Sequence, residues 1–241
     1  MRAIRTFFAV NLSVEVVRAI TSAQRTARQR CAEAGWEIKW LAPPNLHLIM
    51  RYLGDVSQAI APPIKEELSE VVSAFPPILL HSCGVRLIDE PGGEESPRAL
   101  VVNVTDETGG LQRLHSALND PLKELGFKPS EAALECHVVV ARASKAGSQP
   151  IEELLADLRE QDFGVCFARE LVFYRSDVCA PKGEYARLWH ISFEGQAERG
   201  DQVETPAAGD DPDTAPLPAP ESPSVEERAD TDTLTEPPVE A

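Results

Sequence analysis

The chain has 241 residues, a formal net charge of -16 and 43% hydrophobic residues, enough for one sizeable core or for two small lobes that share one. This acidic composition disfavours binding to duplex DNA, because nonspecific affinity for nucleic acid depends on accumulated Lys and Arg contacts with phosphates. No stretch approaches the roughly 18 consecutive apolar residues of a membrane-spanning helix, so we expect no membrane partner.

In the first half of the chain, apolar periodicity and turn residues predict alternating strands and helices. The run of Phe and Val before Asn11 is typical of a buried strand. Ser13 is placed to cap the following helix, and Gly35 is placed to end it. We expect strands over residues 5–12, 37–40 and 46–53, and helices over 13–34 and 57–74.

The second half repeats this rhythm. We expect strands near residues 78–88, 99–104, 134–142, 165–174 and 185–193, and helices near 108–125 and 151–160. Short connections and the lack of a regular parallel repeat favour antiparallel pairing and an α+β class. Two similar strands, one per half, each carry a histidine. They indicate two pseudo-equivalent lobes, each with an antiparallel sheet and helices, around a central cleft.

Residues 195–241 differ from the rest in composition. They hold 13 of the 39 acidic residues, 2 of the 23 basic residues and 8 of the 20 prolines. Such a segment buries too little apolar surface to offset the entropy of ordering. We therefore predict a folded domain over residues 1–194 and a disordered acidic tail over 195–241, for which an interaction tail is the functional alternative.

The cysteines and the N-terminal residues indicate which cofactors and which cellular compartment to expect. The five cysteines form no CxxC pair and no zinc-like spacing with the histidines, so we expect reduced thiols, no metal and no cofactor. The first apolar run reaches Asn11 within a few residues and has no small-residue cleavage site, which predicts no signal peptide. We expect a cytoplasmic monomer.

Two histidines lie in matching contexts. The segments are NLHLIMRYLG and ECHVVVARAS, in which apolar residues and then an arginine follow the histidine. A period of two places His47, Ile49 and Arg51 on one face of the first strand, and His137 with Val139 on one face of the second. A lone histidine on an apolar strand is more often a core residue. The matched pair instead predicts two imidazoles that converge on one cavity.

Two such imidazoles suit in-line opening of a cyclic phosphate. One would take a proton from water while the other gives a proton to the leaving ribose oxygen. Pseudo-symmetry leaves open which histidine is the base and which is the acid. His81, His115 and His190 have no matching partner motif, so we expect them to be structural or exposed.

Several segments resemble a known family, in family order and spacing, over roughly residues 4–194. They are RTFFAVNLS, the pattern W-x-x-P-x-N-L-H at 40–47, YLGDV, PRALVVNV, LQRLHSALNDPLKELGFKP, HVVVAR and LVFYRSDVCAPKGEYARLWHISF. These segments are similar to the two-histidine phosphoesterase superfamily. Within it, they are most similar to the LigT-like RNA 2′,3′-cyclic phosphodiesterases, once named 2′-5′ RNA ligases.

The resemblance implies a bilobal fold in which His47 and His137 are the catalytic residues. The implied reaction opens a 2′,3′-cyclic phosphate, at an RNA end or on a nucleotide, to a 2′-phosphate without a metal. By family position, Arg142 and Tyr185 would border the substrate. Arg142 is off parity with His137, and an ordinary strand aromatic is the alternative for Tyr185.

The sequence departs from the family pattern after each histidine. The family has His-x-Thr or His-x-Ser, whereas this chain has Ile49 and Val139 at the third position. Each missing hydroxyl would donate a hydrogen bond to phosphate worth about 1.5 to 3 kcal/mol. Losing both predicts roughly two to four decades in rate if the loss is felt fully in the transition state. The β-branched replacements keep the strand geometry.

Several alternatives stay open. Another donor, such as Arg51, Arg142, Tyr185 or a backbone amide, takes over the phosphate, or the enzyme is slow or acts on a different cyclic phosphate. Alternatively, the domain is catalytically impaired and binds a phosphate or nucleotide without turnover. An interaction protein that uses its acidic tail is a further reading, but it gives no reason for matched imidazoles. Any RNA contact is expected at a terminus in the cleft.

Overall fold

The computed structural model describes residues 3–89, 98–130, 133–179 and 184–196. Of the predicted acidic tail, residues 197–241 lie outside the described residues. The strands are β1 (Ala3–Asn11), β2 (Glu37–Trp40), β3 (His47–Ser57), β4 (Ile78–Asp89), β5 (Arg98–Thr105), β6 (His137–Lys145), β7 (Asp162–Ala168), β8 (Glu170–Cys179) and β9 (Tyr185–Ser192). The α-helices are α1 (Val14–Glu33), α2 (Ala61–Ser73), α3 (Gly110–Ala117), α4 (Asn119–Glu124) and α5 (Ile151–Leu154).

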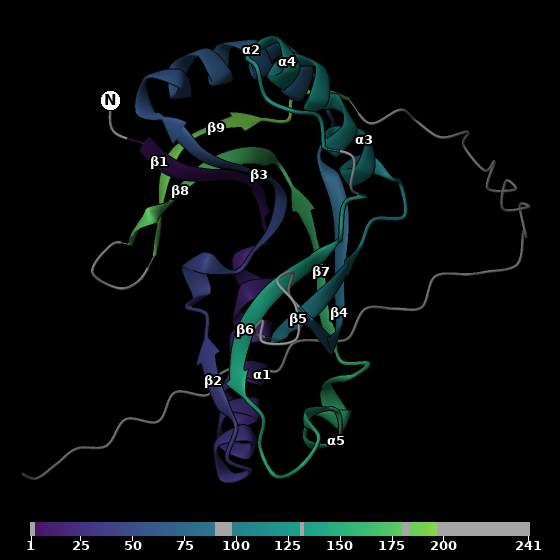
Figure 1. Cartoon of the computed structure of the whole chain (residues 1–241). Helices are drawn as coiled ribbons and strands as arrows, with labels where there is room; N and C mark the ends of the chain where they lie inside the picture. The colour runs from purple at the N-terminus through teal and green to yellow at the C-terminus, as the bar shows by residue number, and fades with distance from the viewer. Residues whose placement is uncertain (1–2, 90–97, 131–132, 180–183, 197–241) are drawn as a thin grey trace, which may run out of the picture. The chain divides into compact units, whose positions relative to one another are not determined.

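The described strands form one antiparallel sheet in two halves. The strand order is β7-β4-β5-β6-β3-β1-β8-β9, and β2 pairs with β6. One half holds β1, β3, β8 and β9, at the top of Figure 1, and the other holds β2, β4, β5, β6 and β7 below it. The halves meet where Leu48 of β3 pairs with Val138 of β6. The predicted α+β class with antiparallel pairing is confirmed, and the two lobes share one continuous sheet.

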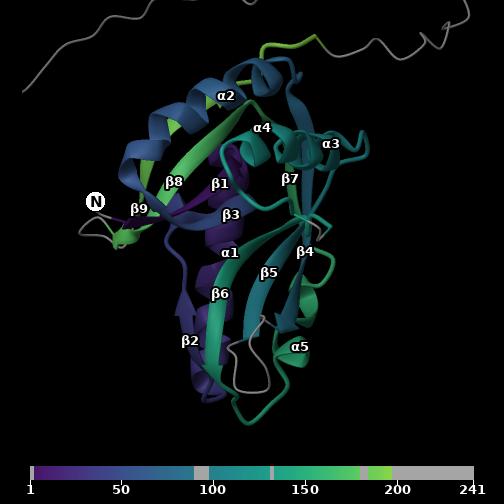
Figure 2. The same ribbon diagram turned by 45° about the horizontal axis from the view of Figure 1, so that its top comes forward.

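Each half of the sheet is covered by a helix. Helix α2 packs on β9 in the upper half, and α1 packs on β7 and β2 in the lower half, as both ribbon views show (Figures 1 and 2). Helix α1 follows β1 in sequence, so the chain crosses between the halves at Ser13. The Ser13 hydroxyl accepts a hydrogen bond from the Val16 amide, which confirms the predicted cap.

The main core lies between the sheet and these helices. It runs through both halves and includes Leu48, Met50, Val138 and Val140. A second, smaller cluster contains Phe7, Ala9, Val172 and Tyr174 and lies on the other face of the upper half. The alternation of side chains along β1 produces both, because successive strand residues point to opposite faces.

Several element boundaries differ from the predictions. The helix predicted over 151–160 is only α5, which ends at Leu154 and is followed by a 3-10 turn, and α2 begins at Ala61 instead of residue 57. Strand β3 runs past Gly54 to Ser57, because Gly54 stays in the ladder opposite Thr6. The predicted helix over 108–125 is two helices. Pro121 has no N–H to continue the first one. The predicted strand over 165–174 is two strands that part at Arg169, because β7 pairs in the lower half and β8 in the upper.

Candidate functional site

The pairing of Leu48 with Val138 positions the two histidines. Both partners are fully buried in the core. His47 and His137 each stand one residue earlier, so they lie on the opposite face of the sheet. In an antiparallel ladder they are diagonal neighbours, whose Cα atoms stand about 7–8 Å apart. The register therefore brings both histidines to one face of one sheet, hereafter the histidine face.

Strand β3 carries an extra residue, Met50, three places after its histidine. The flanking residues Ile49 and Arg51 pair with consecutive residues of β1, Ala9 and Phe8. Consecutive strand residues face opposite sides, so Ile49 stays on the histidine face while Arg51 turns to the core. The predicted common face of the histidine and Arg51 is wrong, because a β-bulge inverts the alternation.

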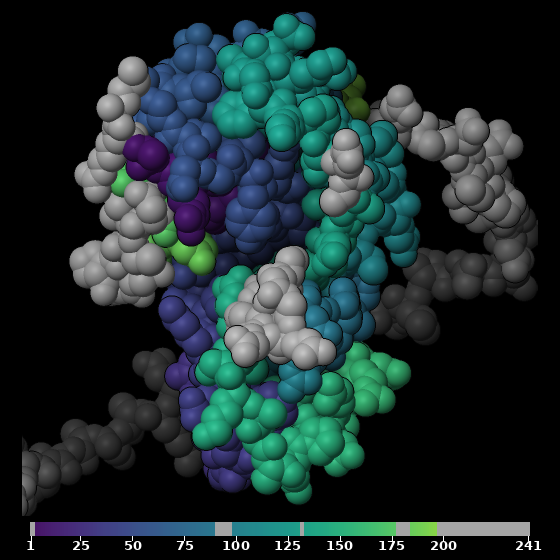
Figure 3. All heavy atoms as spheres, viewed as in Figure 1, coloured from purple at the N-terminus to yellow at the C-terminus, as the bar shows by residue number. Residues whose placement is uncertain are grey.

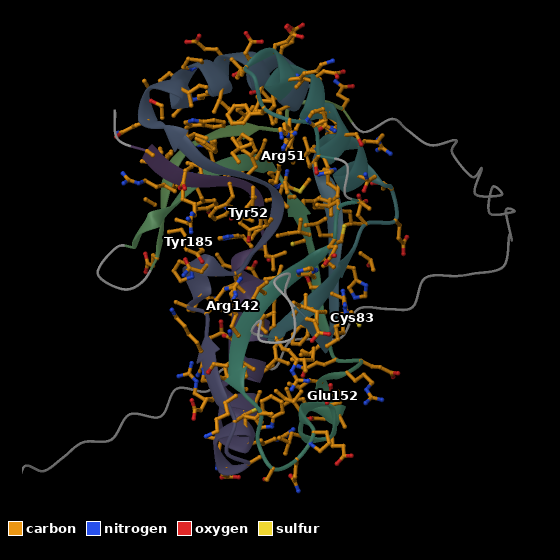
Figure 4. The ribbon with its side chains drawn as sticks, viewed as in Figure 1. Arg51, Tyr52, Cys83, Arg142, Glu152 and Tyr185 are labelled. Carbon is orange, nitrogen blue, oxygen red and sulfur yellow. The ribbon has the colours of Figure 1, made fainter. Side chains whose placement is uncertain are left out.

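Arg51 has structural partners on the core side. Its side chain is 8% exposed, and its guanidinium donates to Asn119 Oδ1 at 2.8 Å and to the backbone carbonyl of Lys128. Burial lowers the pKa of Arg51. Burial, followed by the Arg51 charge, also lowers the pKa of the neighbouring His115. Figure 4 labels Arg51 above Tyr52 and Arg142, on the side of the view that holds α3 and α4.

Strand β6 has the same irregularity at the same offset. Val139 and Ala141 pair with consecutive residues of β5, so Val140 is the extra residue, three places after His137. Val140 and Ala141 both belong to the core. The bulge therefore returns Arg142 to the histidine face, although plain alternation predicts the opposite. The position that the family resemblance implied for Arg142 thus has a geometric basis.

The residue five places after each histidine faces the same side. On β6 this residue is Arg142, and on β3 it is Tyr52, which is 63% exposed and lies 5.9 Å from Phe7 between ring centroids. Sequence reasoning missed Tyr52. No glycine, proline or turn residue marks the Met50 bulge, so only the observed register identifies the face.

His47 lies in an aromatic environment and is 4% exposed. Its ring stacks on Tyr174 at 4.9 Å and on Phe7 at 5.3 Å between centroids, and Tyr185 lies tilted at 5.9 Å. Burial lowers the pKa of His47 to about 4, opposed only in part by the nearby Pro44 backbone. Within the described residues, Nδ1 of His47 makes no hydrogen bond. The ring is therefore neutral at neutral pH.

His137 has a more polar environment. Its side chain is 15% exposed, and Nδ1 lies 3.5 Å from the Glu135 carboxylate. The two histidines are therefore alike in register and unlike in surroundings.

Tyr185 is held beside His47 through its backbone. The Tyr185 amide donates to Asn45 Oδ1 at 3.1 Å, and the Tyr185 ring meets Phe7 edge-on at 5.4 Å. Asn45 is the buried asparagine of the W-x-x-P-x-N-L-H pattern and ends a short turn directly before β3. The motif thus connects β9 to the strand that carries the histidine.

The histidine face is hollowed. Figure 3 shows the surface drawn inward between the purple and blue residues of β1 and β3 and the teal residues of β6 below. Tyr52, Tyr185 and Arg142 surround this region in the stick view (Figure 4). Ile49 and Val139 lie on the same face. Because both side chains are hydrocarbons, neither motif presents a hydroxyl there at its third position.

Other predicted features have simpler settings. His81 pairs with Asp162 at 3.0 Å, and His190 lies 3.8 Å from Glu170. In the described part of the chain, no group of three or more His, Cys, Asp or Glu side chains is arranged to hold a metal ion. No described helix is both long enough and apolar enough to cross a bilayer.

Known proteins resemble this chain in sequence and in fold. No family model matches it. A protein of Archaeoglobus fulgidus named RNA 2′,3′-cyclic phosphodiesterase is 30% identical over 146 residues, which cover 61% of this chain and 78% of the relative. A protein of the same name from Thermotoga maritima is 26% identical over 192 residues, which cover 79% of this chain and 96% of the relative.

Solved structures share the fold of this chain. TT0787 of Thermus thermophilus superposes with a TM-score of 0.63 at 22% identity, over 80% of this chain and 100% of that one. E. coli LigT complexed with 3′-AMP superposes with a TM-score of 0.57 at 22% identity, over 80% of this chain and 99% of that one. The chain therefore belongs to the RNA 2′,3′-cyclic phosphodiesterase family, the LigT-like branch of the two-histidine phosphoesterases.

Proposed function

We propose that this protein hydrolyses 2′,3′-cyclic phosphates at RNA ends or on nucleotides, leaving a 2′-phosphate, with His47 and His137 as the acid-base pair and without a metal. Family membership makes it a hydrolase of phosphodiester bonds. The observation that carries the proposal is the Leu48–Val138 pair, because it makes the two histidines diagonal neighbours on one face. Diagonal neighbours are far enough apart to admit a phosphate and near enough to reach both of its sides.

The surroundings of the rings assign their roles. His47 is neutral because burial lowers its pKa to about 4, so it is the base that accepts a proton from water. A base of such low pKa is intrinsically weak, but a bound phosphate anion beside the ring raises its pKa in the complex. His137, next to the Glu135 carboxylate, is the acid that protonates the leaving ribose oxygen.

Side chains around the pair provide the substrate contacts. Arg142 supplies positive charge on the same face as His137, and guanidinium groups bind phosphate with paired hydrogen bonds. Tyr52 and Tyr185 offer rings on the His47 side, and unpaired bases stack on such rings. E. coli LigT, which shares the fold, was crystallised with 3′-AMP, and this supports a nucleotide as ligand.

The partner is a terminus rather than a long RNA tract. The net charge of -16 opposes extended contact with a polyanion. We expect a single RNA end or a cyclic nucleotide to occupy the histidine face of a monomeric protein.

An assay with matched variants tests the mechanism. Purified protein with EDTA and adenosine 2′,3′-cyclic phosphate should form 2′-AMP, and both His47→Ala and His137→Ala should reduce the rate at least a hundredfold, the order expected of one general acid or base. His81→Ala is the control, because this histidine pairs with Asp162 on the surface. Turnover that survives both substitutions would rule out the mechanism.

A binding module is the second candidate. It is favoured by Ile49 and Val139, which lack the hydroxyls that the family uses. In that case the same preparation binds 2′-AMP with an affinity that depends on His47 and His137 and shows no turnover. Titration calorimetry beside the assay separates the two functions.

A further inference from the structure

A third bulge presents another arginine on the histidine face. Val85 of β4 pairs with the buried Val102 of β5 and so faces the core. Gly84, with φ of 74°, is the extra residue before it, and glycine is the residue that adopts this conformation in a bulge. The next residue, Arg86, therefore lies on the histidine face and is exposed.

Arg86 stands in the same cross-strand row as a missing hydroxyl. Arg86 pairs with Val101 of β5, and Val101 pairs with Val139 of β6. Neighbouring strands lie about 4.8 Å apart, and an extended arginine side chain spans more than one such spacing. Its guanidinium can therefore pass over Val101 toward Val139, the position where the family has Thr or Ser.

The guanidinium of Arg86 is held by an asparagine that is paired with His137. Arg86 Nε donates to Asn103 Oδ1 at 2.6 Å, and Asn103 is the cross-strand partner of His137. The Asn103 amide nitrogen in turn donates to the Gly84 carbonyl at 3.5 Å. Within the described residues, the two terminal nitrogens of Arg86 have no hydrogen-bond partner. The Arg86 guanidinium is thus anchored through Nε, and its terminal nitrogens remain for a ligand.

The corresponding row on the His47 side differs. From Ile49 it runs to Ala9 and then to Val172, which are both buried and apolar, and among the described residues it reaches a polar side chain, His190, only on β9. The asparagine opposite His47 is Asn11, and its side chain is engaged by Tyr174 and Glu170. Among the described residues, the position two strands from Val139 is therefore an arginine, whereas the position two strands from Ile49 is a valine.

We propose that Arg86, held by Asn103, binds the phosphate of the substrate and replaces the hydroxyl that is missing at Val139. This inference rests on the proposed function and names the residue that lets the degenerate site keep its ligand. Paired N–H donors of a guanidinium match two phosphate oxygens. The anchor on Nε leaves the terminal nitrogens to make that contact.

Binding measurements with a phosphate probe and a phosphate-free probe test the assignment. Arg86→Met should weaken 2′-AMP binding about ten- to a hundredfold, as expected for a lost charged hydrogen bond, and should leave adenosine binding unchanged. Arg86→Lys keeps the charge and loses the Nε anchor, so it should recover only part of the affinity. Arg18→Met, on the exposed face of α1, is the matched control for loss of one surface charge.

A rescue experiment excludes an indirect effect. Val139→Thr restores a donor in the same row, so it should raise 2′-AMP affinity more in the Arg86→Met background than in the wild-type chain. Unchanged 2′-AMP affinity in a normally folded Arg86→Met protein would overturn the assignment. Because affinity is measured without turnover, an inactive protein whose 2′-AMP binding depends on Arg86 would sink the proposed hydrolysis and sustain the phosphate contact. A wild-type chain that binds no 2′-AMP would overturn both.

Discussion

Leu48 and Val138 are cross-strand partners, and each directly follows a histidine on its own strand. The relative position of His47 and His137 is therefore set by backbone pairing at the seam of the sheet and not by a loop. A slip of one residue at this seam would turn one imidazole toward the core. Burial of both partners in the apolar core fixes the register.

Restoring the motif hydroxyls should raise activity. Ile49→Thr combined with Val139→Thr returns two donors to the histidine face, and kcat/KM should rise at least tenfold because hydrogen bonds to a charged phosphate are worth about 1.5 to 3 kcal/mol each. Most of the gain should come from Ile49→Thr, since Arg86 already serves the other row. Val165→Thr, on an exposed strand position, is the control. An unchanged rate in a folded double variant would mean that both donors are already replaced.

The two motif arginines should separate stability from activity. Arg51→Met removes the donor to the Lys128 carbonyl and one of the two donors to Asn119 Oδ1, which keeps the Ser130 amide, so it should lower the free energy of unfolding by about 2–4 kcal/mol. Arg142→Met should lower kcat/KM about tenfold and change the free energy of unfolding by less than about 0.5 kcal/mol. Urea denaturation and initial rates measure the two quantities. A loss of activity in Arg51→Met together with a loss of stability in Arg142→Met would contradict the placement of Arg51 in the core and Arg142 on the histidine face.

The buried His47 should make folding stability depend on pH. Its pKa falls from 6.5 to about 4 on folding because of burial, so the unfolded chain binds the proton more readily than the folded chain. The contribution of His47 to the free energy of unfolding is complete above pH 6.5. As the pH falls toward 4, roughly 3 kcal/mol of it is lost. Urea denaturation between pH 7.5 and 4 should show that the free energy of unfolding of the wild type falls relative to that of His47→Phe as the pH falls. Parallel curves would refute this.

A glycine pair isolates the cost of the β4 bulge. A Cβ at Gly84 would lie 2.5 Å from the Arg159 carbonyl oxygen, whereas a Cβ at Gly126 meets nothing within 4 Å, and both residues have positive φ. Gly126→Ala should therefore cost only the backbone strain, about 1–2 kcal/mol. Gly84→Ala should cost more and should also weaken 2′-AMP binding by moving Arg86. Equal melting temperatures for the two variants would contradict the close contact.

The sequence predicts where helices and strands lie better than it predicts which strands pair and which side of the sheet each side chain faces. Strand β2 and the Ser13 cap follow from local patterns and agree with the structure. The break at Arg169 does not, because an uninterrupted apolar run continues from one half of the sheet into the other. A local pattern carries no information on which distant strand each segment joins.

The same limit applies to the candidate site. Matched motifs single out His47 and His137, and the register brings them to one face. Alternation fails after Met50 and Val140, because a bulge depends on pairing with a neighbouring strand and neither residue type marks it. Arg51 is misplaced for this reason, and Tyr52 and Arg86 are missed. The catalytic roles and the domain boundary at residue 194 remain predictions.

The two bulges at one offset also matter for protein engineering. A mutant library built on alternate positions after each histidine would replace core residues such as Arg51 and Ala141 and would destabilise the fold in many variants. Randomising the second and fifth positions after each histidine instead samples Ile49, Tyr52, Val139 and Arg142. Those four codons are where selection for a new ligand preference has room to act.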